Sequence, residues 1–80
     1  MDEKQIRARI QTLIAGGEVP CDTPDAVYGG YGEGLRCSLC DERIPKNEIE
    51  FEIDLPTGTR LRVHRRCEAI WLEECHTPAG

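Results

Sequence analysis

Residues 37–67 read CSLCDERIPKNEIEFEIDLPTGTRLRVHRRC, a segment that begins and ends with residues able to bind metal. The first pair is Cys37 and Cys40 in C-S-L-C, and the second is His64 and Cys67 in H-R-R-C. Together they form the pattern C-x2-C-x23-H-x2-C. A structural zinc site takes four Cys or His ligands at tetrahedral angles, and ligand pairs of this close spacing are typical of it. The pattern predicts one Zn²⁺ ion bound by Cys37, Cys40, His64 and Cys67.

The residues between the two pairs predict a β-hairpin that brings the pairs together. Acidic and apolar residues alternate over 48–55, and arginine alternates with apolar residues over 60–63. Such alternation is typical of strands with one buried face. A turn that contains Gly58 joins the two runs. We expect the acidic residues to face outward and to pair with Arg60 and Arg62 across the hairpin.

Helices are predicted on both sides of this segment. The first spans residues 1–16, with Asp2 as its N-cap, Gly16 and Gly17 as its stop, and one apolar stripe formed by Ile6, Ile10, Leu13 and Ile14. This stripe either packs on the rest of the domain or pairs with a second chain, because so short a helix is marginal alone in water. The second helix is predicted over 65–76, where Thr77 and Pro78 end it.

Residues 17–36 are rich in Gly and Pro and follow no periodic pattern, so they predict an irregular loop. Gly29–Gly34 reads GGYGEG, but it lacks the Lys-Ser/Thr ending and the preceding strand of a phosphate-binding loop. We therefore expect no phosphate site there. Tyr28 and Tyr31 are candidates for an exposed contact surface.

The composition indicates one small domain that needs a cross-link. The chain has 80 residues and five Cys, with only 17 Leu, Ile, Val and Phe to form a core. We divide this single domain, 1–80, into the helix at 1–16, the loop at 17–36 and a zinc-binding part at 37–76. The net charge of −5 disfavours a protein that coats duplex nucleic acid.

The N-terminal sequence and the hydropathy pattern predict a cytoplasmic protein without a membrane partner. The first ten residues, MDEKQIRARI, lack the apolar core of a secretory signal. No apolar run approaches the roughly 18 residues that a membrane span requires. In the cytoplasm thiols stay reduced, and Cys pairs more often bind metal than each other.

Cys21 and Cys75 are predicted to be packing thiols rather than redox groups or ligands of a second metal. Cys75 lies eight residues beyond Cys67 on the predicted helix, which separates their Cα atoms by about 12 Å. Two sulfurs on one zinc ion lie within roughly 4 Å of each other. Cys21 has no second ligand at a suitable spacing. His76 is expected to be solvated.

A C-x2-C turn, a hairpin, and a helix whose first turn carries the second ligand pair together resemble a treble-clef zinc finger. The H-x2-C pair is similar to that of the first finger of LIM domains and of the zinc finger of poly(ADP-ribose) polymerases. The C-x-L-C…H-R-R-C core also resembles small bacterial proteins. The resemblance covers residues 37 to about 75. It implies an α+β treble clef, here with an added N-terminal helix, and Cys37, Cys40, His64 and Cys67 as zinc ligands.

Four protein ligands leave no open position for water, so the predicted zinc is structural and not catalytic. Three thiolates and a neutral imidazole give the site a net charge of −1. Arg36, Arg65 and Arg66 are expected to offset this charge and to donate hydrogen bonds to sulfur. We therefore expect a non-enzymatic interaction module that binds a protein partner or itself, through the N-terminal helix or the two tyrosines.

Two other functions stay open at this point. The first is a nucleic-acid-binding zinc finger that uses Arg60, Arg62, Arg65 and Arg66, although these arginines have the acidic hairpin residues and the metal site as alternative partners. The second is a thiol redox protein based on C-x2-C, a motif that usually occurs in a βαβ setting. The favoured hypothesis remains the interaction module.

Overall fold

The computed structural model describes residues 1–76, which form two helices and a three-stranded antiparallel sheet. The fold is therefore α+β, as predicted. The elements follow one another as α1 (Glu3–Ala15), β1 (Ala26–Tyr31), β2 (Ile49–Asp54), β3 (Arg60–His64) and α2 (Arg65–His76). The predicted helix stop at Thr77 and Pro78 lies outside the described residues. Over residues 1–76, no helix has both the length and the apolar character to span a membrane.

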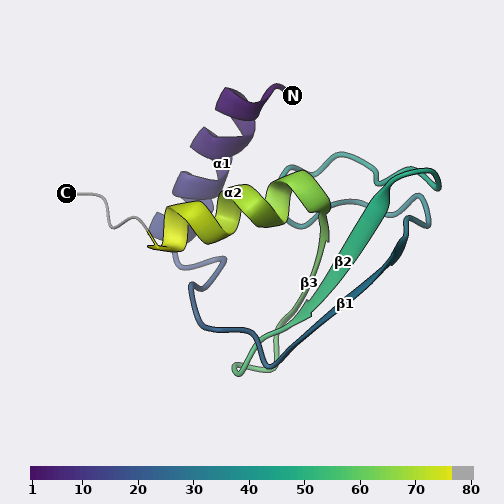
Figure 1. Ribbon diagram of the computed structural model, residues 1–80. Helices are drawn as coiled ribbons and strands as arrows, with labels where there is room; N and C mark the ends of the chain where they lie inside the picture. Colours follow the sequence, from purple (N-terminus) through teal and green to yellow (C-terminus); the bar gives the residue numbers. More distant parts are fainter. Residues whose placement is uncertain (77–80) are drawn as a thin grey trace.

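The sheet, α2 and α1 form successive layers (Figure 1). The helix α2 packs on β2 and β3, and α1 packs on α2. Both helices therefore lie on the same side of the sheet. The other face of the sheet is covered by neither of these helices.

The helix α1 begins and ends where its sequence predicts. The Asp2 carboxylate accepts a hydrogen bond from the Gln5 backbone N–H at 2.9 Å, and the Gln5 side chain accepts one from the Asp2 N–H at 3.1 Å. This reciprocal pair is a capping box. Gly17 ends the helix with a φ of 75°. Ile6 and Ile10 are buried within the chain, so the apolar stripe packs on the domain, the first of the two predicted alternatives.

The strand β1 corrects the prediction that residues 17–36 form a loop throughout. It pairs antiparallel with β2, with Gly29 opposite Phe51 and Gly30 opposite Glu50. A Cβ atom at Gly29 would lie 3.2 Å from the Phe51 ring, so glycine allows this ring to pack against the strand backbone. The sheet order is β1-β2-β3, which makes β2 the central strand.

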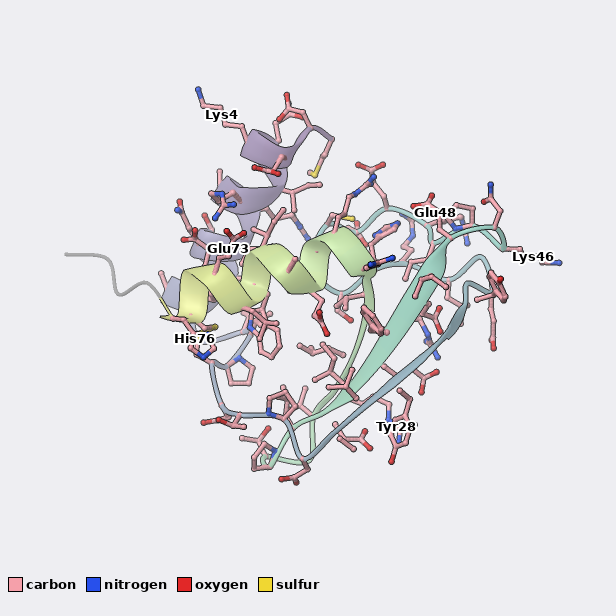
Figure 2. All side chains as sticks on the ribbon, viewed as in Figure 1. Lys4, Tyr28, Lys46, Glu48, Glu73 and His76 are labelled. Atoms are coloured by element: carbon pink, nitrogen blue, oxygen red, sulfur yellow. A yellow bond between two sulfur atoms is a disulfide. The ribbon has the colours of Figure 1, made fainter. Side chains whose placement is uncertain are left out.

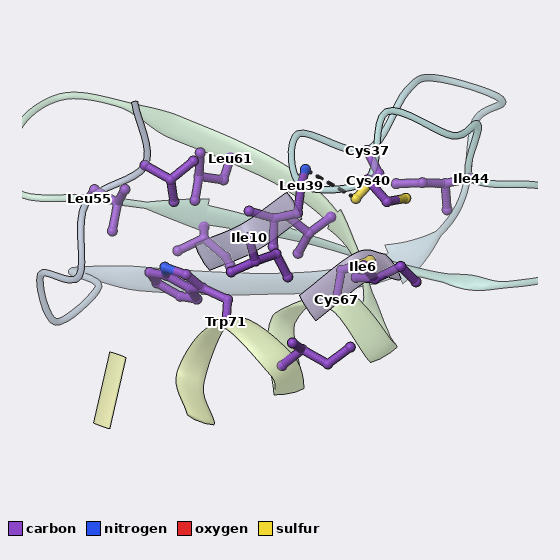
Figure 3. Packing of buried hydrophobic residues seen from close by; sticks show 14 residues of the cluster. Ile6, Ile10, Cys37, Leu39, Cys40, Ile44, Leu55, Leu61, Cys67 and Trp71 are labelled. Atoms are coloured by element: carbon purple, nitrogen blue, oxygen red, sulfur yellow. Dashed lines mark hydrogen bonds between the residues drawn. The ribbon is translucent and has the colours of Figure 1, made fainter. Parts of the chain in front are cut away.

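The core fills the space between the sheet and the helices. Figure 3 shows Cys37 and Cys40 at one end of this core and Trp71 with Leu55 at the other. Trp71 is buried, and its indole N–H donates a hydrogen bond to the Pro20 carbonyl at 3.1 Å. The buried residues of the core are Ile6, Ile10, Val19, Cys37, Leu39, Cys40, Ile44, Ile53, Leu55, Leu61, Val63, Cys67, Ile70 and Trp71.

A disulfide joins Cys21 and Cys75, so the prediction that both are separate packing thiols is wrong. The prediction compared Cys75 only with Cys67 on its own helix. The chain after α1 instead returns to the C-terminal end of α2 and brings the two Cα atoms to 5.3 Å. Disulfides persist most readily in oxidising compartments, so this bond does not support the expectation that all thiols stay reduced. The cytoplasmic location stays a prediction.

Candidate metal centre

The four residues predicted as ligands lie together in the core. Their ligand atoms are all within 4.8 Å of one another, and each residue is at most 2 % exposed. The Cys40 and Cys67 sulfurs lie 3.4 Å and 3.8 Å from Nδ1 of His64. Metal bonds of about 2.3 Å to sulfur and about 2.0–2.1 Å to nitrogen place tetrahedral sulfur and nitrogen ligands about 3.5 Å apart. The Cys3His cluster of Cys37, Cys40, His64 and Cys67 can therefore hold one metal ion.

Two hydrogen bonds attach the turn over residues 37–40 to β3. The Ser38 N–H donates to the Arg62 carbonyl at 2.7 Å, and the Arg62 N–H donates to the Ser38 hydroxyl at 3.1 Å. Because Arg62 lies two residues before His64, these bonds hold the first ligand pair beside the second. The turn ends at Asp41, whose φ is 63°. Asp is one of the few residues that adopt this left-handed conformation routinely.

The second ligand pair lies at the junction of β3 and α2. His64 is the last residue of β3, and Cys67 lies in the first turn of α2. The Nε2 atom of His64 is 3.1 Å from the Arg43 carbonyl oxygen. Since a carbonyl only accepts, Nε2 carries the hydrogen and Nδ1 presents its lone pair to the cysteines. Metal-bound histidines generally have such a partner on their other ring nitrogen.

The protonation of the three thiols also fits a cation site. A hydrogen bond from the Cys67 thiol lowers the pKa of Cys37, and nearby backbone N–H groups act in the same direction against the effect of burial. That hydrogen bond together with burial raises the pKa of Cys67, and burial raises the pKa of Cys40. Cys37 is therefore the most acidic of the three thiols. A bound divalent ion supplies the charge that lets all three ionise.

Backbone groups and α1 support the cluster. The Leu39 N–H donates to the Cys37 sulfur at 3.4 Å (Figure 3). Arg9 of α1 donates from Nε to the Leu39 carbonyl at 2.9 Å. Arg36, which was predicted to donate to sulfur, donates instead to the Asp41 carbonyl at 2.7 Å, and that prediction is wrong. The support from Arg9 and from the Arg43 carbonyl was missed because both contacts involve backbone oxygens, which no residue pattern marks.

The arginines of the predicted basic patch divide into two groups. Arg60 binds Asp54 at 2.6 Å, and Arg62 binds Glu52 at 3.2 Å, so the predicted pairing across the hairpin is confirmed. Arg65 and Arg66 are exposed on the first turn of α2 and line a hollow there. Neither donates a described hydrogen bond to a cluster sulfur. Nucleic-acid binding through the four arginines stays a prediction.

The fold and the cluster together define a small α+β protein with a buried Cys3His site that can hold one metal ion. No protein family, curated protein or solved structure matches this chain.

Proposed function

We propose that this protein is a non-enzymatic, structural zinc-binding module. The observation that supports it most is the buried cluster whose four ligand atoms lie within 4.8 Å of one another. A tetrahedral set of three thiolates and an imidazole favours Zn²⁺ over harder divalent ions. Four protein ligands leave no coordination position for water or substrate, as in structural rather than catalytic zinc sites.

We further propose that the module is of the treble-clef type. This assignment is supported by the order of the elements that carry the ligands. The turn at 37–40 comes first, the hairpin of β2 and β3 follows, and the second pair lies where β3 meets α2. In this proposal α1 and β1 are additions to the zinc finger, with α1 bound to the turn through Arg9.

The partner of the module is proposed to be a protein. The chain carries a net charge of −5, and Arg60 and Arg62 are already paired with carboxylates. Tyr28 and Tyr31 are 55 % and 73 % exposed on β1. Tyrosine is enriched at protein interfaces, where its ring gives apolar area and its hydroxyl stays hydrated. The proposed contact surface is therefore β1 and not the apolar stripe of α1, which packs inside the domain.

Native mass spectrometry with a chelator competition tests the zinc proposal. We expect one Zn²⁺ per chain, lost on acidification, and at least tenfold weaker binding by Cys40→Ser. The matched control is the double variant Cys21→Ser, Cys75→Ser, which removes two sulfurs outside the cluster and should still bind one Zn²⁺. A folded wild-type chain that binds no zinc, or a Cys40→Ser variant that binds it as tightly, contradicts the proposal.

A further inference from the structure

The face of the sheet that the helices leave uncovered carries an acidic hollow of about 170 Å³. It is lined by residues 28–31 of β1, by Glu33, and by Glu50 and Glu52 of β2. Figure 2 shows Tyr28 on the side of the sheet away from α2. The hollow is separate from the metal cluster, with which it shares no residue.

Glu50 gives this hollow an unsatisfied buried acceptor. The residue is only 5 % exposed, and its Oε2 lies 3.2 Å from Nε of Arg62. That contact is too poorly aligned for a hydrogen bond, so Arg62 Nε has no acceptor and Glu50 Oε1 has no donor within residues 1–76. Buried carboxylate oxygens are almost always hydrogen-bonded, so an unpaired one marks a place for a further donor.

The charges around Glu50 favour a positively charged donor. Arg62 is shared between Glu50 and Glu52, at 3.2 Å from each. Arg60 lies closest to Asp54, at 2.6 Å. Carboxylates outnumber arginines on this face, with Glu33, Glu50, Glu52 and Asp54 against Arg60 and Arg62. The remaining negative charge attracts a cation.

Glycine and tyrosine leave room for that cation beside Glu50. Gly30 lies directly opposite Glu50 in the sheet register, on the same face. A Cβ atom at Gly30 would meet nothing within 4 Å, so the space over this part of the sheet is open because residue 30 has no side chain. Tyr28 lies opposite Glu52 on the same face and is 55 % exposed, so its ring is available beside the hollow.

We propose that this hollow binds the guanidinium group of one arginine side chain from a partner protein. The planar fork of arginine donates to carboxylate oxygens in pairs and stacks on aromatic rings, which lysine does less well. The volume of 170 Å³ is close to the roughly 150 Å³ of an engineered cavity that holds one benzene molecule. The inference names the partner chemistry of the interaction module and therefore rests on the proposed function.

The test is an NMR titration of the zinc-loaded full chain with the acetylated and amidated peptide Gly-Gly-Arg-Gly-Gly. Peptides with citrulline or lysine in place of arginine are the matched ligands. We expect saturable shifts of the amide signals over 28–33 and 50–52, with a Kd on the order of 1 mM for a single side chain. The citrulline peptide, which lacks the charge, should bind at least about tenfold more weakly. The lysine peptide should also bind more weakly.

Two variants locate the binding. Gly30→Val places a side chain in the open space and should weaken binding about tenfold or more, whereas Ala26→Val, in the same strand outside the hollow, should not. Glu50→Gln should weaken binding in the same way, and Glu18→Gln, which removes one charge outside the hollow, is its control. Zinc content and the amide spectrum of each variant are recorded first, so that lost binding is not confused with unfolding.

Three outcomes overturn the inference: equal binding of the arginine and citrulline peptides, equal binding of the lysine peptide, or undiminished binding by Gly30→Val. A zinc-loaded protein that binds no arginine peptide also overturns it but leaves the zinc proposal standing. A chain that binds no zinc overturns the proposed function itself. The two failures are therefore distinguishable.

Discussion

Removal of the Cys21–Cys75 disulfide should reduce the stability of the folded protein by about 4 kcal/mol. The bond links residues separated by 54 positions in sequence. In the chain-entropy treatment, a loop of this size removes roughly 14 cal/mol/K from the unfolded chain, or about 4 kcal/mol at 25 °C. A chain of 80 residues at roughly 0.05–0.15 kcal/mol per residue has a total stability of about 4–12 kcal/mol. The disulfide therefore accounts for a third or more of the stability.

The assay is thermal unfolding of the zinc-saturated protein, followed by the fluorescence of Trp71. This residue is the single tryptophan of the chain and is 1 % exposed, so its emission reports loss of the core. For a domain of this size about 1 kcal/mol shifts Tm by roughly 4–8 °C. We expect Tm to fall by about 15–30 °C in the double variant Cys21→Ser, Cys75→Ser. A phosphine reductant should lower the wild-type Tm in the same way and leave that of the variant unchanged.

Two results refute this reasoning. One is a loss of stability below about 1 kcal/mol in the double variant. This result would mean that the disulfide restricts the unfolded chain much less than the loop-entropy calculation assumes. The other is quantitative alkylation of Cys21 and Cys75 in the isolated protein before any reductant is added, which would show free thiols at both positions.

Three further predictions concern the metal, the backbone and one ion pair. Removal of metal by a chelator should unfold the part from residue 37 onward, because zinc binding contributes about 10–16 kcal/mol in comparable sites. An unchanged circular dichroism spectrum and a cooperative melting transition of the metal-free protein would contradict this prediction. Gly32→Ala should lower stability by about 1–3 kcal/mol in urea unfolding, because its Cβ would overlap two carbonyl oxygens of the facing segment. Gly30→Ala is the control, because its Cβ would have no atom within 4 Å and should leave the stability unchanged. Hydrogen bonds from Gln11 and Arg7 lower the pKa of Glu74. The ionised Glu74 side chain therefore stabilises the folded protein at pH values above its unfolded-state pKa, and this stabilisation is lost as the pH falls through its folded-state pKa. The difference in unfolding free energy between wild type and Glu74→Gln should therefore become smaller as acid is added. A difference that grows at low pH would contradict the lowered pKa of Glu74.

The metal cluster and the elements next to it follow directly from residue types and spacing. Two ligand pairs identify the cluster, because few residues other than Cys and His bind a soft divalent ion. The hairpin follows from alternation over 48–55, and α1 follows from its apolar period and the capping pair of Asp2 and Gln5. Each of these signals is local, which is why the sequence alone suffices to predict them.

The features that the sequence did not predict depend on contacts between distant segments. The strand β1 has no apolar alternation, since it is exposed along most of its length and pairs only because β2 offers a free edge. The missed strand also explains the error at Glu50, which was expected to face solvent but lies between β1 and β3 on the central strand. The disulfide between Cys21 and Cys75 was missed because disulfide connectivity cannot be deduced from sequence alone.

The helix α2 has a different kind of cross-link near each end. Cys67, in its first turn, belongs to the metal cluster, and Cys75, in its last turn, is bonded to Cys21. A chelator acts on the first attachment and a thiol reductant on the second. Because chelation should unfold the chain from residue 37 onward, it should speed amide exchange along the whole of α2, whereas reduction should speed exchange from the C-terminal turn first. The two attachments of one helix therefore differ in reach, and the extent of amide exchange along α2 reports which of them has been lost.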